Sequence, residues 1–271
     1  MIPATVWLAS YPKSGNTWLR VLLDNWFADS AGPSDINNLT PLEWSPNNPT
    51  RFASATLLPA AELLPGEIEQ LRAPATQLIA SEIGHGRTAL VKIHNAYTPA
   101  FGPGVARAAI YLVRDPRDVV PSLAAHLNIS IEQAIDTLNS PTAILGVSSS
   151  RLPRQLPQPL SDWSGHVRGW LDESDLRIHV VRYEDLPGAF AGVLEFLGQP
   201  PDASRLEKAI RYSRMEELQS QERAKGFKEG ERERPFFRQG RSGAWRHVLT
   251  PSQTARIEST HAHQMQRFAY V

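Results

Sequence analysis

The sequence predicts an α/β fold: a P-loop-like doubly wound sheet in which a central parallel β-sheet is flanked by helices. Two observations predict it. Several short runs are continuously apolar and rich in Val, Ile or Leu, which suits strands buried on both faces of a parallel sheet. Helical patterns separate these runs, and such alternation is typical of doubly wound α/β proteins. We expect one domain over residues 1–271.

Four runs are the predicted strands. Taken alone, any one of them could also be a turn of a buried helix, but four runs separated by helical patterns favour a sheet. The predicted strands are "VWLAS" (6–10), "ALVKIH" (89–94), "AIYLVR" (109–114) and "IHVVRY" (178–183).

The helices are predicted from apolar periodicity and from caps. In residues 15–28 one face carries five apolar side chains, namely Leu19, Leu22, Leu23, Trp26 and Phe27. A second helix is expected to begin at Asp115-Pro116, because Asp is a favoured N-cap and Pro a favoured first residue. The others are predicted over Leu186–Leu197, with Asp185 as cap and Gly198 near the end, and over residues 252–268.

Composition excludes several kinds of site. Lys and Arg together number 28, as do Asp and Glu, so we expect no nucleic acid as partner. The absence of cysteine excludes disulfides, thiolate metal sites and cysteine nucleophiles, and it is compatible with a reducing cytoplasm. The sequence shows no signal peptide and no apolar stretch approaching ~18 residues. We therefore expect a cytoplasmic protein with no membrane span.

Three segments interrupt the pattern of strands and helices: residues 30–56, 139–161 and 219–236. They are rich in polar residues or proline, which is typical of surface loops. Long loops often carry substrate specificity, so we expect them to form substrate walls or a lid, with plain solvated loops as the alternative. The highly charged third segment is expected to be mobile.

The stretch "YPKSGNTW" (11–18) joins the first predicted strand to the first predicted helix. Backbone N–H groups and the helix dipole favour an anion at such a junction. Lys13 adds a positive charge, and Gly15 permits close approach of the backbone. A phosphate-binding NTPase loop would read GxxxxGK[ST], whereas here the Lys precedes the Gly. The alternative is a tight turn with a solvated Lys.

Three further segments follow this loop in order: "YLVRDPRDVVPS" (111–122), "VRYEDL" (181–186) and "FFRQGRSGAWRHVLT" (236–250). Together the four segments resemble the sulfotransferases that use 3′-phosphoadenosine 5′-phosphosulfate (PAPS), with adenosine 3′,5′-bisphosphate (PAP) as product. The resemblance runs from residue 6 to about residue 250. It implies in-line transfer of a sulfuryl group to a hydroxyl of a small-molecule acceptor, with no metal.

The resemblance also implies the catalytic residues. His94 and Lys92 match the K-x-H arrangement of the family, with His94 as general base and Lys92 at the sulfuryl oxygens. A neutral imidazole can accept the proton of an attacking hydroxyl. Lys13 matches the Lys at the bridging oxygen, where negative charge develops during transfer.

The resemblance assigns three parts of the cofactor site. The 5′-phosphosulfate part is Lys13, Ser14, Gly15, Asn16 and Thr17; the 3′-phosphate part is Arg114, Ser122, Arg238, Gln239 and Gly240; the adenine part is Trp18, Tyr183 and Met215. Gln239 replaces a family Lys, "GAWR" replaces GDWK, and Met215 takes the place of a Phe. Trp18 could equally be a core residue, and Arg117 and Asp118 are expected in an ion pair or a cap.

The acceptor is predicted only by class: a phenol or alcohol of a secondary metabolite, with a carbohydrate or a lipid as the alternative. The alternatives from other functional classes are an ATP-dependent kinase and a non-catalytic nucleotide-binding protein. Candidate acceptor contacts are Tyr97, Phe101, Trp44 and Phe227. The family's dimer-forming segment is not recognisable, so the oligomeric state stays open.

Overall fold

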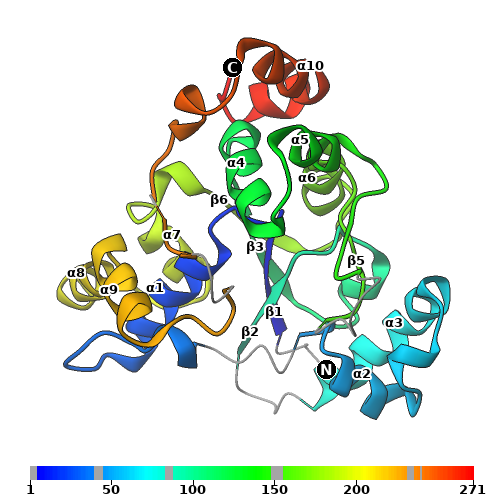
Figure 1. Cartoon of the computed structure of the whole chain (residues 1–271). Helices are drawn as coiled ribbons and strands as arrows, with labels where there is room; N and C mark the ends of the chain where they lie inside the picture. The colour runs from blue at the N-terminus through cyan, green and yellow to red at the C-terminus, as the bar shows by residue number, and fades with distance from the viewer. Residues whose placement is uncertain (1–4, 40–44, 83–87, 148–154, 231–234, 239) are drawn as a thin grey trace.

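The computed structural model describes residues 5–39, 45–82, 88–147, 155–230, 235–238 and 240–271. A four-stranded sheet of order β2-β1-β3-β6 lies at its centre, and all three neighbouring pairs are parallel (Figure 1). The strands are β1 (Thr5–Ser10), β2 (Ala89–Ile93), β3 (Ala108–Val113) and β6 (Arg177–Arg182). The predicted parallel sheet is confirmed, with each predicted strand matched to within one residue at either end.

Helices cover both faces of the sheet, which explains why its central strands are continuously apolar. In β1, Val6 and Leu8 pack into one cluster, and Trp7 and Ala9 pack into another on the opposite face. The first cluster includes residues of α1, α7 and α8, and the second includes residues of α4, α5, α6 and α10. Figure 1 shows α1 beside α8 on one side of the sheet and α4, α5 and α6 on the other.

The bounds of the helices are as follows. The α-helices are α1 (Asn16–Ala28), α2 (Pro49–Thr56), α3 (Pro65–Ser81), α4 (Pro116–Leu127), α5 (Ile131–Asn139), α6 (Trp163–Leu171), α7 (Phe190–Phe196), α8 (Ala203–Tyr212), α9 (Met215–Lys225) and α10 (Pro251–Arg267). Short 3-10 helices are η1 (Ile36–Asn38), η3 (Ala60–Glu62), η4 (Pro99–Phe101), η5 (Tyr183–Asp185) and η6 (Ala244–His247). Within the described ranges no helix is long and apolar enough to cross a membrane.

Local chemistry explains which helix predictions are confirmed. The Asp115 carboxylate caps α4 by accepting the Arg117 N–H at 2.9 Å, and Pro116 is the first residue of that helix. The predicted helix over Leu186–Leu197 is wrong at its start, because α7 begins only at Phe190. Leu186 is extended, since a residue before proline is biased away from helical backbone angles, and Asp185 lies in η5.

The three segments predicted as surface loops contain regular structure, and their role as substrate walls or a lid stays a prediction. The first contains η1 and α2, and the second contains the antiparallel pair β4 (Ile144–Leu145) and β5 (Gln158–Pro159). The third begins inside α9, whose Leu218 is buried against the apolar residues of a neighbouring cluster. Three of its charged residues, Glu222, Arg223 and Lys225, lie on this helix, whose acidic first turn and basic last turn suit the helix dipole.

Candidate active site

The loop between β1 and α1 has the backbone that close contact requires. Gly15 has φ 99°, and an added Cβ would lie 2.5 Å from Cδ2 of Tyr183, so only glycine lets this ring pack on the loop. Lys13 also lies in the left-handed region, at φ 68°. The Ser14 hydroxyl and Oδ1 of Asn16 are buried without a hydrogen-bond partner among the described residues. A buried, unpartnered hydroxyl beside a helix N-terminus suits a bound anion.

Four cationic side chains from four segments gather here: Lys13 from the loop, Lys92 from β2, Arg114 after β3 and Arg238 from the C-terminal segment, by which we mean residues 235–238 and 240–250. The pKa of Lys13 is lowered to about 7, first by burial and then by the charges of the other three. Burial and the charge of Arg114 also lower the pKa of Arg238. Such mutual repulsion is relieved when an anion binds, so the arrangement is that of an anion site.

The structure brings most of the predicted 3′-phosphate residues together. Arg114 donates from Nη1 to the Lys13 carbonyl at 3.0 Å, which ties it to the loop. Arg238 donates to the carbonyl of Pro121, the residue before Ser122, at 3.3 Å. Gly240 has φ 59° and lies against Met215. Gln239 lies outside the described residues.

Two of the predicted adenine residues, Trp18 and Tyr183, pack against each other, and Met215 packs with Trp18 against one apolar cluster. Trp18 and Tyr183 have ring centroids 5.5 Å apart, and the Trp18 indole donates to the Ser213 carbonyl at 2.8 Å. The Arg114 guanidinium lies 4.2 Å from the centroid of the Tyr183 ring. Phe236 was missed from the sequence, although its ring lies 3.9 Å from Nζ of Lys13. The aromatic pair that precedes Arg238 in the sequence was the available signal.

Hydrogen bonds to its neighbours orient His94 so that it can act as a general base. Its Nδ1 lies 2.8 Å from the Ser10 carbonyl, so Nδ1 carries the hydrogen and Nε2 is left as the acceptor. Burial, followed by the charge of Lys92, lowers the pKa of His94 well below its ordinary value. His166 hydrogen-bonds through Nε2 to the His94 carbonyl at 3.0 Å and through Nδ1 to the Tyr111 hydroxyl at 2.8 Å. His166 thus fixes the backbone that carries the base.

Lys92 makes a contact that the sequence did not predict. Its Nζ lies 3.2 Å from Oε2 of Glu229, whose carboxylate also contacts Nη1 of Arg20 at 2.7 Å. Glu229 follows α9, so the segment predicted as a wall reaches the carboxyl end of β2. A separation of 137 residues between Lys92 and Glu229 leaves no local signal for this pairing.

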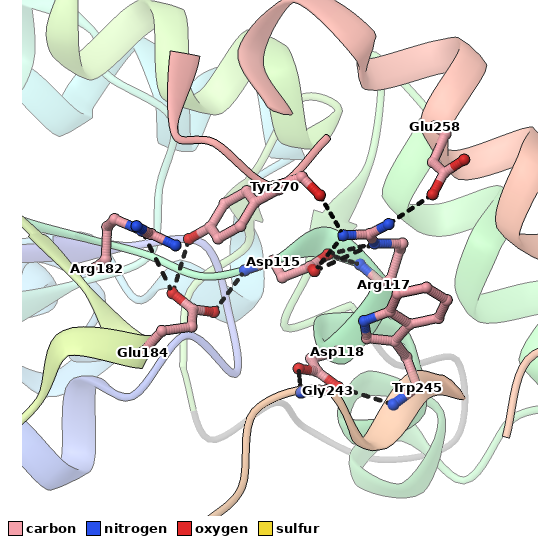
Figure 2. A network of polar contacts seen from close by, with 9 residues as sticks. All are labelled: Asp115, Arg117, Asp118, Arg182, Glu184, Gly243, Trp245, Glu258 and Tyr270. Carbon is pink, nitrogen blue, oxygen red and sulfur yellow. Dashed lines mark hydrogen bonds and ion pairs between the residues drawn. The ribbon is translucent and has the colours of Figure 1, made fainter. Parts of the chain in front are cut away.

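A second polar network holds the C-terminal segment on α4 (Figure 2). Asp118 accepts the N–H groups of Gly243 and Trp245 at 2.6 and 2.9 Å. Arg117 binds Asp115 at 2.7 Å and Glu258 at 2.5 Å. Arg117 thus lies in an ion pair, as one of the two expected roles has it, with Asp115 and Glu258 as partners, while Asp118 binds backbone N–H groups at the start of η6. A cavity of about 250 Å³ lies beside this network, and none of the four repelling cations lines it.

Glu222 fixes the start of the C-terminal segment in the same way. Its carboxylate accepts the N–H of Phe236 at 2.7 Å and the N–H of Phe237 at 2.9 Å. Both residues precede Arg238, and Glu222 lies on α9, the helix that begins with Met215.

Two predicted acceptor contacts are wrong. Phe101 is fully buried, and its ring packs against Trp7. The Phe101 carbonyl also accepts the Trp7 indole N–H at 2.8 Å, which holds the two residues together. Phe227 is covered by Phe236 and Phe237, with ring centroids 4.8 and 5.1 Å away. Tyr97 is half-buried beside Trp170, and its role stays a prediction. Trp44 lies outside the described residues.

Within the described ranges, no three His, Asp or Glu side chains lie close enough together to bind a metal ion. The expectation that no metal takes part stays a prediction.

Residues 106–269, more than half of the chain, match the family model described as "sulfotransferase domain". The chain belongs to the sulfotransferase family. This confirms the resemblance seen in the four sequence segments and the assignment as a transferase.

Two curated relatives show how far this similarity extends. Mouse sulfotransferase 2B1 is 24% identical over 284 residues, covering 98% of this chain and 73% of the relative. Cytosolic sulfotransferase 16 of Arabidopsis thaliana is 26% identical over 286 residues, covering 94% and 74%.

Solved structures support the fold of this sulfotransferase. Retinol dehydratase in complex with androsterone and the inactive cofactor PAP superposes with a TM-score of 0.62 at 20% identity, covering 98% of this chain and 81% of that one. A mouse sulfotransferase complexed with PAP gives 0.57 at 18% identity, covering 96% and 83%. The predicted α/β architecture is therefore that of solved sulfotransferases.

Proposed function

We propose that this sulfotransferase transfers a sulfuryl group from PAPS to a hydroxyl of a small-molecule acceptor. One observation carries the proposal: four cations converge on the loop at the carboxyl edge of the sheet, where burial and the charges of the other three lower the pKa of Lys13 to about 7. Ligands of parallel α/β sheets bind at this edge. The solved relatives that contain PAP support the same choice of cofactor.

The residues present fit a cofactor with a phosphate at each end. At the 5′ end, the unpartnered Ser14 hydroxyl, Lys13 and the N–H groups at the start of α1 are free to meet an anion. Toward the 3′ end, Arg114 has a buried Nε without a described hydrogen-bond partner, and Arg238 lies beside the turn that contains Ser122. Trp18, Tyr183 and Met215 supply the surface for the adenine. PAPS, when bound, supplies the sulfuryl group.

Side chains of this protein supply the general base and the positive charges that the transfer needs. Nε2 of His94 takes the proton of the acceptor hydroxyl, because Nδ1 is already committed to the Ser10 carbonyl. Lys13 and Lys92 place positive charge where negative charge develops, which favours the transition state over the ground state. Buried surroundings strengthen this effect, since fixed charges act more strongly when water is excluded.

The acceptor is proposed as a phenol or alcohol of a secondary metabolite. Solved relatives are described with retinol and with androsterone, which are small molecules, so a compact acceptor is supported as a class. A carbohydrate or a lipid is the second candidate. A cytoplasmic location and a single domain stay predictions, and the oligomeric state stays open.

Calorimetric titration without added metal tests the proposed cofactor. We expect PAP to bind at least about 100-fold more tightly than 5′-AMP, because each charge-assisted hydrogen bond to the 3′-phosphate contributes about 1.5–3 kcal/mol. ADP is the control, since it has as many phosphates but none at the 3′ position. Equal affinity for all three nucleotides would exclude the proposed 3′-phosphate site, and binding of ADP only with magnesium would support a kinase.

The lowered pKa of Lys13 predicts a proton uptake. An anion binds the ammonium form, so binding raises the pKa of Lys13 above about 7 and the affinity for PAP falls as the pH rises from 6 to 8.5. At pH 8, titrations in buffers of different ionisation enthalpy should show close to one proton taken up per PAP bound. Lys13→Met should abolish this uptake, and uptake unchanged in that variant would assign the proton to another group.

A further inference from the structure

Lys92 is joined to a buried arginine through a single carboxylate. Nη1 of Arg20 lies 2.7 and 3.0 Å from the two oxygens of Glu229, and Nζ of Lys92 lies 3.2 Å from one of them. The Arg20 side chain is 2% exposed, and the other two are 18% exposed. The three residues come from α1, from β2 and from the segment after α9, so the contact connects three separate parts of the fold.

We propose that Glu229 is a positioning residue, anchored by Arg20, that holds the ammonium of Lys92 in place for the sulfuryl group. The inference rests on the proposed function, because only PAPS brings a sulfuryl group to Lys92. It adds a residue from the predicted acceptor wall to the machinery of transfer.

The geometry supports a fixed carboxylate. Glu229 contacts Arg20 through both oxygens, and separating a carboxylate from a buried guanidinium is costly. Glu229 therefore stays in place when ligands bind. A lysine side chain is flexible, but an ammonium has three N–H donors. The described contact with Glu229 uses one donor and fixes the direction of the other two.

Charge balance supports the same role. Among the described residues, Lys92 interacts electrostatically with Lys13 from the loop, Arg20 from α1, His94 after β2, His126 from α4 and Glu229, and only Glu229 in this set is an acid. Burial lowers the pKa of Lys92, the charge of Arg20 lowers it further, and Glu229 opposes both. The carboxylate thus favours the charged form of Lys92 while burial favours the neutral form of His94, and the proposed reaction uses both.

The test compares PAPS with PAP, because the two ligands differ only in the sulfuryl group. In the variant Glu229→Gln we expect about a 10-fold loss of affinity for PAPS at pH 8, the size of one charge-assisted contact, with affinity for PAP unchanged. The loss should become smaller as the pH is lowered, because Lys92 in the variant is then more fully protonated. Glu216→Gln is the matched control, since Glu216 is exposed on α9 and should leave both affinities as in wild type.

Several outcomes would overturn the inference. An equal loss for PAPS and PAP at every pH would make Glu229 a purely structural residue. Tighter binding of PAPS would mean that the carboxylate competes with the sulfuryl group. If Glu229→Gln does not fold, the double variant Arg20→Met/Glu229→Met, which exchanges the pair for apolar side chains, should show the same selective loss, and an unchanged ratio would refute the role.

The failure of this inference is distinguishable from the failure of the proposed function. If wild-type protein binds PAP no more tightly than 5′-AMP, the proposed cofactor is wrong. If wild type shows that preference and the ratio of PAPS to PAP affinity is the same in Glu229→Gln at all pH values, only the role of Glu229 is wrong.

Discussion

Replacing His94 with alanine is expected to lower kcat by about 10²–10⁴-fold, which is the usual contribution of a positioned general base. The affinity for PAP should hardly change, because the imidazole faces the acceptor hydroxyl in the proposed mechanism. The measurement is turnover of PAPS with a phenolic acceptor, together with a calorimetric titration of PAP. Because the pKa of His94 lies well below its ordinary value, the acid limb of the wild-type pH profile should also lie well below pH 6.5.

His263→Ala is the control, since His263 is an exposed residue of α10. It should retain wild-type turnover. A His94→Ala variant with normal kcat would remove His94 from the role of base, and a variant that lost PAP binding in parallel would assign His94 to the cofactor site.

The second large effect is expected at the anion loop. In Gly15→Ala, the new Cβ meets Tyr183 at 2.5 Å and the residue keeps a φ of 99°, so the loop or the ring must move. Strain of this kind costs about 1–3 kcal/mol and overpacking about as much, so we expect a Tm lower by roughly 10 °C. The affinity for PAP should fall by more than about 10-fold, because the same shift displaces the adenine surface and the loop.

Gly32→Ala is the matched control for this variant. An added Cβ at Gly32 has no atom within 4 Å, so stability and PAP binding should both be unchanged. If Gly15→Ala melted like wild type and bound PAP normally, the close packing of Tyr183 on the loop would be irrelevant to the site.

The sheet and the anion loop could be predicted from sequence because both depend on local patterns. Buried parallel strands need continuous apolar runs, and a strand–loop–helix junction with Lys13 and Gly15 carries its own chemistry. α9 was misread for the opposite reason. A surface helix with one buried residue, Leu218, has almost no periodic signal and resembles a solvated loop.

Side-chain pairings distant in sequence could not be predicted. Glu229 is one of many charged residues, and nothing near it indicates that its carboxylate reaches Lys92 and Arg20. Phe101 was predicted to contact the acceptor because it lies shortly after β2 and His94 in the sequence. Its burial against Trp7 depends on how η4 packs, which is a property of tertiary structure.

The bonds from Glu222 to the N–H groups of Phe236 and Phe237 have a consequence for how ligands assemble on this protein. Met215, at the adenine end, and Arg238, at the 3′-phosphate end, are carried by one helix and the segment attached to it. Ordering one end therefore orders the other, and the entropy of that ordering is lost only once. Adenosine and inorganic phosphate, added as separate fragments, would thus bind cooperatively, each increasing the affinity for the other.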